Sequence, residues 1–314
     1  MMTRSLSPFM LGATLYMPAT RDDLAEIILH AKIPDLRSLV VCLEDAVSES
    51  DLAQALLNLD QLLRTLEKAA CHEETAQRPL VFIRPRHEAM AAMLVEKYQL
   101  TGIDGFVLPK FTQQSLSCWW KIIGSTALAM MPTLETREVY DVNAMTALAV
   151  ALEQHPCRER IVALRIGGND LMSVISLRHP KNLTLYDGPM GYVVKMLVAV
   201  FASRGFSLTA PVCEQIDNLD LLERELALDV AHGLVGKTAI HPSHLERIHQ
   251  GLMVEKDEYE DALRILNSTQ AVFKSQGAMC EPATHRSWAT SILERSKHCG
   301  IARQFDNLFF ATRQ

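Results

Sequence analysis

The sequence lacks the features that mark membrane-spanning and exported proteins. The longest apolar run, Val193 to Phe201, is interrupted by Lys195 and is far shorter than the ~20 residues that a membrane-spanning helix requires. The first residues, MMTRSLSPFMLGATLYMP, contain no continuous apolar segment of the kind found in a signal peptide. These absences predict a cytoplasmic protein that does not enter a membrane.

Cysteine pairs and clustered basic residues are also missing. The seven cysteines are scattered and never spaced as C-x-x-C, which argues against a disulfide framework or a zinc cluster. There is no run of five or six Lys or Arg, and the formal net charge is -6, so nucleic acid is not an expected partner. With 48% hydrophobic residues among 314, the chain can bury one large core.

Eight short apolar runs alternate with longer segments of helical periodicity. A short, continuously apolar run is typical of a parallel strand that is buried on both faces. The runs begin at Ala13, Ser38, Leu80, Gly105, Ala127, Ile161, Phe206 and Gly233. Eight strand and helix units of this kind predict an α/β fold, a closed (β/α)8 TIM barrel of ~250 residues.

The segments between the runs have apolar residues at three- and four-residue spacing, which predicts helices. The clearest cover 22–31, 49–69, 137–153 and 217–229. Segments 256–275 and 285–298 also have this spacing, but they follow the eighth strand. We therefore predict a TIM-barrel catalytic domain over residues 1–250 and a C-terminal helical extension over 251–314 that acts as a lid or an oligomerisation element.

Charged side chains follow the predicted strands, where a TIM barrel builds its active site. These residues are Arg21, Glu44, Asp45, Arg84, Arg86, Lys110, Glu135, Asp170, Glu214 and His241. Glu135 and Asp170 follow successive strands, and oxygen ligands with no Cys and few His are typical of Mg²⁺ or Mn²⁺ rather than zinc. Arg84 is suited to bind a substrate carboxylate with two parallel hydrogen bonds.

These residues also have simpler structural interpretations. A strand-end carboxylate often caps a helix or forms an ion pair, and His241, followed by Pro242, can end one strand and begin a helix. We expect Lys110 to pair with a nearby carboxylate rather than to act as a nucleophile. Gly167 and Gly168 lack the spacing of a nucleotide-binding motif and are expected to let the backbone approach a ligand.

The same segments resemble the HpcH/HpaI aldolase and citrate lyase beta-subunit (CitE-like) superfamily. The resemblance runs through most of the barrel, and its most specific string is VCLEDAV. The matching strings are LYMPATR from Leu15, VCLEDAV from Val41, FIRPR from Phe82, DGFVLPK from Asp104, PTLET from Pro132, GGND from Gly167 and GKTAIHP from Gly236. The tail departs from the family's lid and is similar to a divergent subgroup of carbon-carbon bond lyases associated with tellurite-resistance gene clusters.

The resemblance implies a Mg²⁺-dependent carbon-carbon lyase that cleaves a 2-hydroxy acid or its acyl-CoA thioester, by a retro-aldol or retro-Claisen route, or catalyses the reverse condensation. It assigns the metal to Glu135 and Asp170 and the substrate carboxylate to Arg84. The other predicted site residues are Arg21, Gly167 and Gly168 for substrate binding, and Glu44, Asp45 and Lys110 for catalysis.

The family's lid donates an acid to the active site of a neighbouring subunit. Glu281 is the only carboxylate between Gly277 and Trp288, which makes it the candidate for this proton-handling acid. The alternative is that Glu281 lies in an exposed linker between two helices. The catalytic interpretation requires a homo-oligomer, and we predict a trimer or a hexamer.

Two other functional classes stay open at the level of the sequence. One is a Schiff-base aldolase that uses Lys110 or Lys237 as the nucleophile. The other is a non-catalytic barrel that serves as a binding subunit, although such a protein would have no need of both predicted metal ligands.

Overall fold

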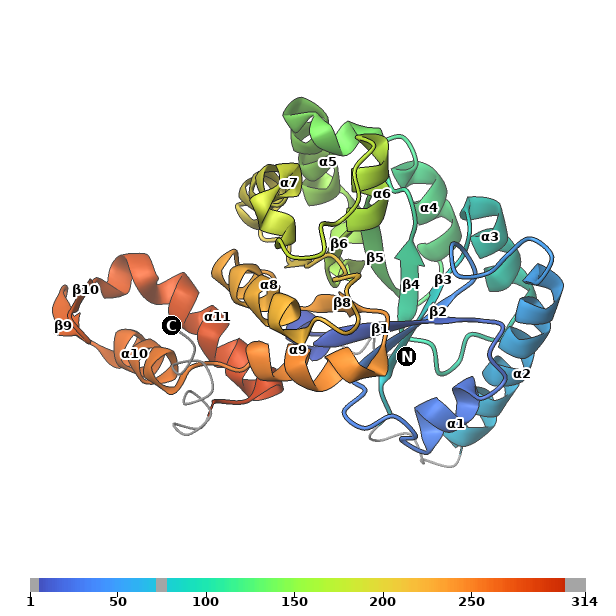
Figure 1. The fold of residues 1–314 in the computed structure, drawn as a ribbon, viewed down its shortest axis with the longest axis horizontal. Coiled ribbons are helices and arrows are strands. Elements are labelled where there is room, and N and C mark those ends of the chain that lie inside the picture. Colours follow the sequence, from blue (N-terminus) through green and yellow to red (C-terminus); the bar gives the residue numbers. More distant parts are fainter. Residues whose placement is uncertain (1–5, 72–77, 303–314) are drawn as a thin grey trace. The chain divides into compact units, whose positions relative to one another are not determined.

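The computed structural model describes residues 6–71 and 78–302, and the chain divides into two compact units, Met1–Ile248 and His249–Gln314. The first unit is built around eight parallel strands (Figure 1). They are β1 (Ala13–Pro18), β2 (Ser38–Cys42), β3 (Leu80–Arg84), β4 (Gly105–Leu108), β5 (Ala129–Leu134), β6 (Leu164–Ile166), β7 (Leu208–Thr209) and β8 (Lys237–Ala239).

The strands form one sheet in the order β7-β6-β5-β4-β3-β2-β1-β8. Each strand from β1 to β7 therefore lies beside its neighbours in sequence, and β8 pairs with β1. An isolated bridge between Ala210 and Lys237, supported by a 2.7 Å bond from the Ala210 N–H to the Gly236 carbonyl, joins the end of β7 to β8. The ring is thereby closed, and the predicted TIM barrel is confirmed.

Helices between the strands cover the outside of this barrel (Figure 1). On α2, Leu59, Leu62, Leu63 and Leu66 are buried, which is the spacing of one apolar helix face. The helices of this unit are α1 (Leu24–Leu29), α2 (Leu52–Cys71), α3 (Glu88–Lys97), α4 (Leu116–Ile123), α5 (Val142–Gln154), α6 (Gly168–Val174), α7 (Pro189–Leu197), α8 (Leu219–Ala231) and α9 (Leu245–Gly251), which crosses the division between the units.

One predicted helix is interrupted. The segment predicted as a helix over 137–153 begins with a separate 3₁₀ turn, Arg137–Tyr140, before α5 starts at Val142. Asp141 lies between them in an extended conformation, and its side chain accepts a hydrogen bond from the Asn143 N–H. This N-cap breaks the run because a capping residue has non-helical backbone angles.

The second unit contains α10 (Lys256–Asn267), β9 (Phe273–Ser275), β10 (Ala278–Cys280) and α11 (Pro282–Cys299). The prediction of a helix over 256–275 is wrong beyond residue 267, because β9 and β10 form an antiparallel hairpin. Gln276 and Gly277 both have positive φ, 49° and 86°, as the favoured two-residue hairpin turn requires. The unit has its own core, formed by Val254, Ala262, Ile265, Phe273, Cys280, Ala289 and Ile292.

The predicted extension, 251–314, starts close to the division at Ile248, and its last part, 303–314, lies outside the described residues. Its roles as a lid or an oligomerisation element stay predictions. Within the described residues, none of the helices is both long and apolar enough to cross a membrane.

Candidate active site

Six charged side chains meet at the carboxyl end of the barrel. Each follows or ends a different strand, apart from Glu44 and Asp45, which both follow β2. The ion pairs and electrostatic interactions among them bring together most of the residues that the sequence predicted for catalysis and metal binding. We refer to the following residues as the mouth cluster: Glu44, Asp45, Arg84, Lys110, Glu135 and Asp170.

Arg84 is the central cation of the mouth cluster. It ends β3, is buried, and uses a single nitrogen, Nη2, for three carboxylates. This nitrogen lies 3.1 Å from Glu135 Oε1 and 3.3 Å from Asp45 Oδ2, and it also pairs with Glu44. The Nε of Arg84 is buried and has no hydrogen-bond partner among the described residues. The Nη2 nitrogen therefore serves the protein's own carboxylates, whereas the Nε–H donor is not used by them.

Lys110 bridges two of these carboxylates. Its ammonium donates a 2.6 Å hydrogen bond to Glu44, and its backbone N–H donates a 2.8 Å bond to Glu135. The backbone of Lys110 has φ 49°, a left-handed conformation that is uncommon for a non-glycine residue and is often found at functional sites. The expectation that Lys110 pairs with a carboxylate agrees with this geometry.

The carboxylates of the mouth cluster are poorly compensated. Burial raises the pKa of Glu135 to about 7. The positive charge of Arg84 lowers this pKa, but the negative charge of the neighbouring Asp170 raises it again. Burial, together with Asp45, also raises the pKa of Asp170. Arg84 is shared by three carboxylates. A further cation would therefore stabilise the ionised forms of Glu135 and Asp170.

Glycine is required beside Glu135. A Cβ at Gly167 would clash with the Glu135 side chain, and a Cβ at Gly168 would lie 2.8 Å from Pro211 Cβ. Real Cβ contacts are longer, so packing alone explains why glycine occupies both positions. Gly167 allows Glu135 to occupy its place beside β6, and the role of both glycines in substrate binding stays a prediction.

Glu135 and Asp170 fit a divalent cation with few protein ligands. Among the described residues, no three His, Cys, Asp or Glu side chains form a ready metal site. Mg²⁺, however, is commonly held by one or two carboxylates and keeps several waters. The raised pKa values of Glu135 and Asp170 show two oxygen donors whose ionised forms a cation would stabilise.

Comparison with protein-family models matches residues 5–301 to the carbon-carbon bond lyases of the TIM-barrel fold. The chain belongs to this family. Solved structures agree with the fold. A citrate lyase from Burkholderia xenovorans LB400 is 17% identical, with a TM-score of 0.69 over 98% of this chain and 100% of the other.

Two further structures have the same fold. CitE from Mycobacterium tuberculosis, in complex with magnesium, acetoacetate and coenzyme A, is 20% identical, with a TM-score of 0.64 over 91% of this chain and 98% of the other. RipC from Yersinia pestis is 19% identical, with a TM-score of 0.57 over 78% of this chain and 96% of the other. None of the curated protein sequences gives a significant match.

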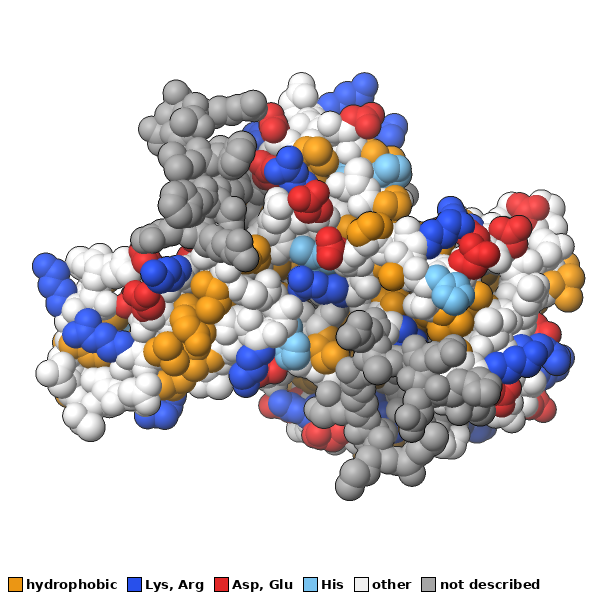
Figure 2. Space-filling view, turned by 90° about the horizontal axis from the view of Figure 1, so that it is seen from below, with side chains coloured by type: hydrophobic (Ala, Val, Ile, Leu, Met, Phe, Trp, Pro, Cys, Tyr) orange, Lys and Arg blue, Asp and Glu red, His pale blue; other side chains and the backbone are white. Residues whose placement is uncertain are grey.

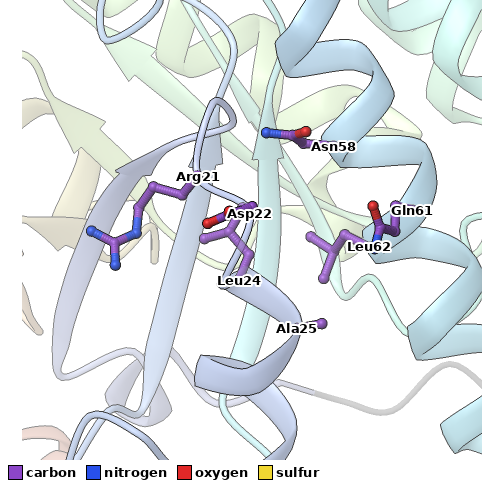
Figure 3. Close-up of a pocket in the computed structure, with 7 residues that line it drawn as sticks. All are labelled: Arg21, Asp22, Leu24, Ala25, Asn58, Gln61 and Leu62. Carbon is purple, nitrogen blue, oxygen red and sulfur yellow. The ribbon is translucent and has the colours of Figure 1, made fainter.

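Arg21 of the lyase forms a local ion pair instead of joining the mouth cluster. Its guanidinium makes two hydrogen bonds to Asp23, of 2.8 and 2.7 Å. Figure 3 shows the side chain extending away from Gln61 and Leu62 on the facing helix α2. Among the residues described, the hydrogen bonds of this guanidinium go to Asp23 alone. Its predicted role in substrate binding would require this pair to open.

Three other charged residues that follow strands have structural partners. Arg86 donates hydrogen bonds to the carbonyls of Leu43 and Val47, at 2.8 and 2.7 Å, and so holds the loop that carries Glu44 and Asp45. His241 caps the 3₁₀ turn Pro242–His244. Glu214 accepts a 3.0 Å hydrogen bond from Asn169, the residue before Asp170.

Glu281 belongs to the second unit and is the N-cap residue of α11. Its backbone N–H donates to His285 Nδ1 at 3.1 Å, and its carboxylate accepts a 3.3 Å bond from the Thr284 hydroxyl. These contacts are local to the start of the helix. The proton-handling role of Glu281 stays a prediction.

Lys237 of β8 contacts the outer helix α8 rather than the mouth cluster. Its ammonium is buried between Asp229, at 2.9 Å, and Glu225, at 3.2 Å, which raise its pKa despite burial. A Schiff-base nucleophile has to be accessible and neutral. Lys237 is neither, so the structure argues against the aldolase alternative at this residue.

Arg165 and Tyr16 lie beside the mouth cluster, although neither was predicted from the sequence. Arg165, in the middle of β6, is fully buried, and its guanidinium carbon lies 5.2 Å from the centre of the Tyr16 ring. The guanidinium carbon of Arg84 lies 6.0 Å from the same ring. The available signal was a charged residue within an apolar run, two positions before Gly167 and hence on the same face of the strand.

Proposed function

We propose that the chain is a divalent-cation-dependent lyase that cleaves a carbon-carbon bond of a 2-hydroxy acid, or of its acyl-CoA thioester, or catalyses the reverse condensation. The observation that carries the proposal is the pairing of Glu135 and Asp170, both with raised pKa values, beside the buried Arg84. Membership of the carbon-carbon bond lyase family supports the class of reaction. The structurally similar CitE, in complex with magnesium, acetoacetate and coenzyme A, supports the choice of metal and substrate.

Glu135 and Asp170 would hold the cation, Mg²⁺ or Mn²⁺, through their carboxylate oxygens. A bound divalent cation makes a substrate hydroxyl more acidic and stabilises negative charge on its oxygen. Gly167 keeps the space that Glu135 occupies. The Lys110 N–H, 2.8 Å from Glu135 Oε1, holds that carboxylate in place.

Arg84 would bind the carboxylate of the substrate. Its Nε has no partner among the described residues, and hydrogen bonds to charged groups contribute ~1.5–3 kcal/mol. Cleavage leaves a carbanion or enolate that needs a proton. Lys110 is the candidate donor within the mouth cluster, because its side chain is about half exposed and its ammonium donates a 2.6 Å hydrogen bond to Glu44.

Asp45 would orient water at the mouth. Its side chain is 62% exposed and lies 3.3 Å from Arg84, so it can accept hydrogen bonds from solvent on the open side of the cluster.

The proposal also includes a cytoplasmic homo-oligomer in which Glu281 serves the active site of a neighbouring subunit. On the face drawn in Figure 2, acidic and basic side chains are interspersed, without a continuous basic track for nucleic acid.

Product formation from candidate 2-hydroxy acids and their acyl-CoA thioesters tests the proposal. A thermal-shift screen with Mg²⁺, small keto acids and acyl-CoA selects the substrates, because a ligand that binds the native state raises its melting temperature. We expect released keto acid or acyl product to disappear with EDTA and in Asp170→Asn. Asp60→Asn, the same change on the exposed Arg64 pair of α2, should have no effect. Full activity in Asp170→Asn would contradict the metal assignment.

Oligomeric complementation tests the role of Glu281. Mixed oligomers of Glu281→Gln and Asp170→Asn subunits should regain part of the activity, because some sites receive one intact residue from each subunit. A fully active monomer would exclude this arrangement.

A further inference from the structure

Arg165 lies in a polar layer inside the barrel, one layer below Glu135. Arg165 is the register partner of Thr133 on β5 and of Thr209 on β7. The side chains of Thr133, Arg165 and Thr209 therefore share the inner face of the barrel. The apolar core of the same unit includes Val40 and Phe82. TIM-barrel interiors are mostly filled with branched apolar residues, which makes this layer unusual.

The guanidinium of Arg165 has no counter-charge in contact. It is 1% exposed, and its hydrogen bonds go to the Thr238 hydroxyl at 2.6 Å and, weakly, to Met131 Sδ at 3.9 Å. Among the residues that the structure describes, it forms no ion pair within 4 Å. It also contacts Tyr16, through the ring and the side-chain hydroxyl, and it interacts electrostatically with Glu135 without an ion-pair contact. Burying an unpaired ion costs several kcal/mol.

A closed hydrogen-bond network does not account for this arginine. The hydroxyls of Thr133 and Thr209, on either side of Arg165, are buried and have no hydrogen-bond partner among the described residues. Arg165 therefore satisfies the Thr238 hydroxyl but not the two threonine hydroxyls that flank it. The cation affects its surroundings mainly through its electric field, which is weakly screened in a protein interior.

The nearest use for that field is the mouth cluster. Both guanidinium groups contact the same ring, that of Tyr16, with the carbon of Arg165 5.2 Å and that of Arg84 6.0 Å from its centre. Arg165 and the mouth cluster together contribute three cationic side chains and four carboxylates. A divalent cation would leave this set with one net positive charge, and without Arg165 the set would be neutral.

We propose that Arg165 is a specificity residue that makes the mouth selective for a substrate with a free carboxylate. Arg165 does not touch the substrate; its charge attracts the carboxylate that binds at Arg84, its neighbour across the shared contact with Tyr16. The proposal rests on the proposed function, and it adds that one uncompensated charge in the layer below selects an anionic ligand over a neutral one of the same shape.

The experiment measures the binding of Mn²⁺ and then, to the Mn²⁺-loaded protein, of pyruvate and its neutral analogue pyruvamide. In Arg165→Met we expect pyruvate to bind ~10-fold more weakly, pyruvamide to bind as before, and Mn²⁺ to bind at least as tightly, because a nearby cation has been removed. Arg165→Lys keeps the charge and should retain most of the pyruvate affinity. The melting temperature of Arg165→Met should not fall, since no buried carboxylate loses its partner.

Arg160→Met is the matched control. Arg160 hydrogen-bonds the carbonyls of Thr126 and Leu128, which precede β5 at the opposite end of the barrel, so none of the three affinities should change. Unchanged pyruvate binding in Arg165→Met would overturn the inference. A joint loss of Mn²⁺ and pyruvate binding would also overturn it, because it would show a structural role. A wild-type protein that binds neither ligand would contradict the proposed function itself.

Discussion

Glu225 on α8 and Glu135 after β5 are both buried, yet their surroundings shift their pKa values in opposite directions. Hydrogen bonds and charges from His179 and Lys237 overcome burial and lower the pKa of Glu225 to about 2. For Glu135, burial and the neighbouring Asp170 outweigh Arg84 and raise the pKa to about 7. The same residue type is thus stably ionised on the outside of the barrel and poorly compensated at the mouth.

The difference follows from the partners of each cluster. Around Glu225, His179 Nε2 lies at 2.6 Å, the Leu185 N–H at 2.8 Å and Lys237 Nζ at 3.2 Å, so both of its carboxylate oxygens have partners. At the mouth, a single nitrogen of Arg84 serves three carboxylates. A satisfied buried network stabilises the fold, whereas an uncompensated one costs stability and is typical of a functional site.

Lys237→Met should have the largest effect on stability. It leaves Glu225 and Asp229 buried without their shared cation, which typically costs ~3–5 kcal/mol. Urea unfolding monitored by circular dichroism measures the change. Lys237→Met combined with Glu225→Gln and Asp229→Asn should recover part of the loss, because the buried charges are removed together. A loss below ~1 kcal/mol in the single variant would show that the network is not stabilising.

Glu135→Gln and Glu225→Gln should change the pH dependence of stability in opposite ways. Because the native pKa of Glu135 lies at about 7, above its ordinary value of 4.5, this group destabilises the protein as pH rises through that interval, by ~3 kcal/mol. Metal-free Glu135→Gln should therefore gain stability over the wild type between pH 5 and 7.5.

Glu225 behaves in the opposite sense. Its native pKa of about 2 means that its contribution is present above pH ~4.5 and is lost as pH falls toward 2. Glu225→Gln should therefore be less stable than the wild type at pH 7 and approach it in acid. If the stability change relative to the wild type followed the same pH dependence in Glu135→Gln and Glu225→Gln across pH 3–7.5, the two carboxylates would not differ as stated.

Gly167→Ala should weaken metal binding by displacing Glu135, since the new Cβ would clash with that side chain. We expect a loss of about tenfold in Mn²⁺ affinity, comparable to the effect of disturbing a group that orients a metal ligand. Gly188→Ala is the control, because a Cβ there meets nothing within 4 Å. Equal Mn²⁺ affinities in the two variants would show that Glu135 can move without consequence.

Lys110→Met should change stability least, by less than ~1 kcal/mol, because half-exposed ion pairs contribute little. The side chain of Lys110 is 54% exposed. If Lys110 donates the proton, the variant should lose turnover without losing substrate affinity, as steady-state kinetics would show. Borohydride with substrate should give no covalent adduct at Lys110, and an adduct would favour the Schiff-base alternative.

The sequence predicts the barrel because its strands are buried on both faces and therefore appear as short, continuously apolar runs. The prediction of a helix over 256–275 failed beyond residue 267, because Phe273–Ser275 is a strand of the hairpin that turns at Gln276 and Gly277, and a short apolar run fits either a helix or a strand. Whether a short apolar segment becomes a helix or a strand depends on its tertiary contacts, which cannot be read from the sequence.

The mouth cluster was predictable because strand ends meet at one edge of a barrel. The pairing of Arg21 with Asp23 was not, since a local ion pair competes with a distant ligand on energies that the sequence does not reveal. The role of Arg165 was not predictable either, because its place inside the barrel follows from the register of β6 with its neighbours. A lysine in the eighth strand, Lys237, could equally have faced inward.

Direct titration of Mn²⁺ into the metal-free protein tests the central claim, that the mouth holds a divalent cation between Glu135 and Asp170. The account predicts one ion per chain in the wild type and in Asp60→Asn, and at least a hundredfold weaker binding in both Asp170→Asn and Glu135→Gln. Two carboxylates are the main protein ligands available to such an ion. Unchanged stoichiometry and affinity in Asp170→Asn and Glu135→Gln would contradict it.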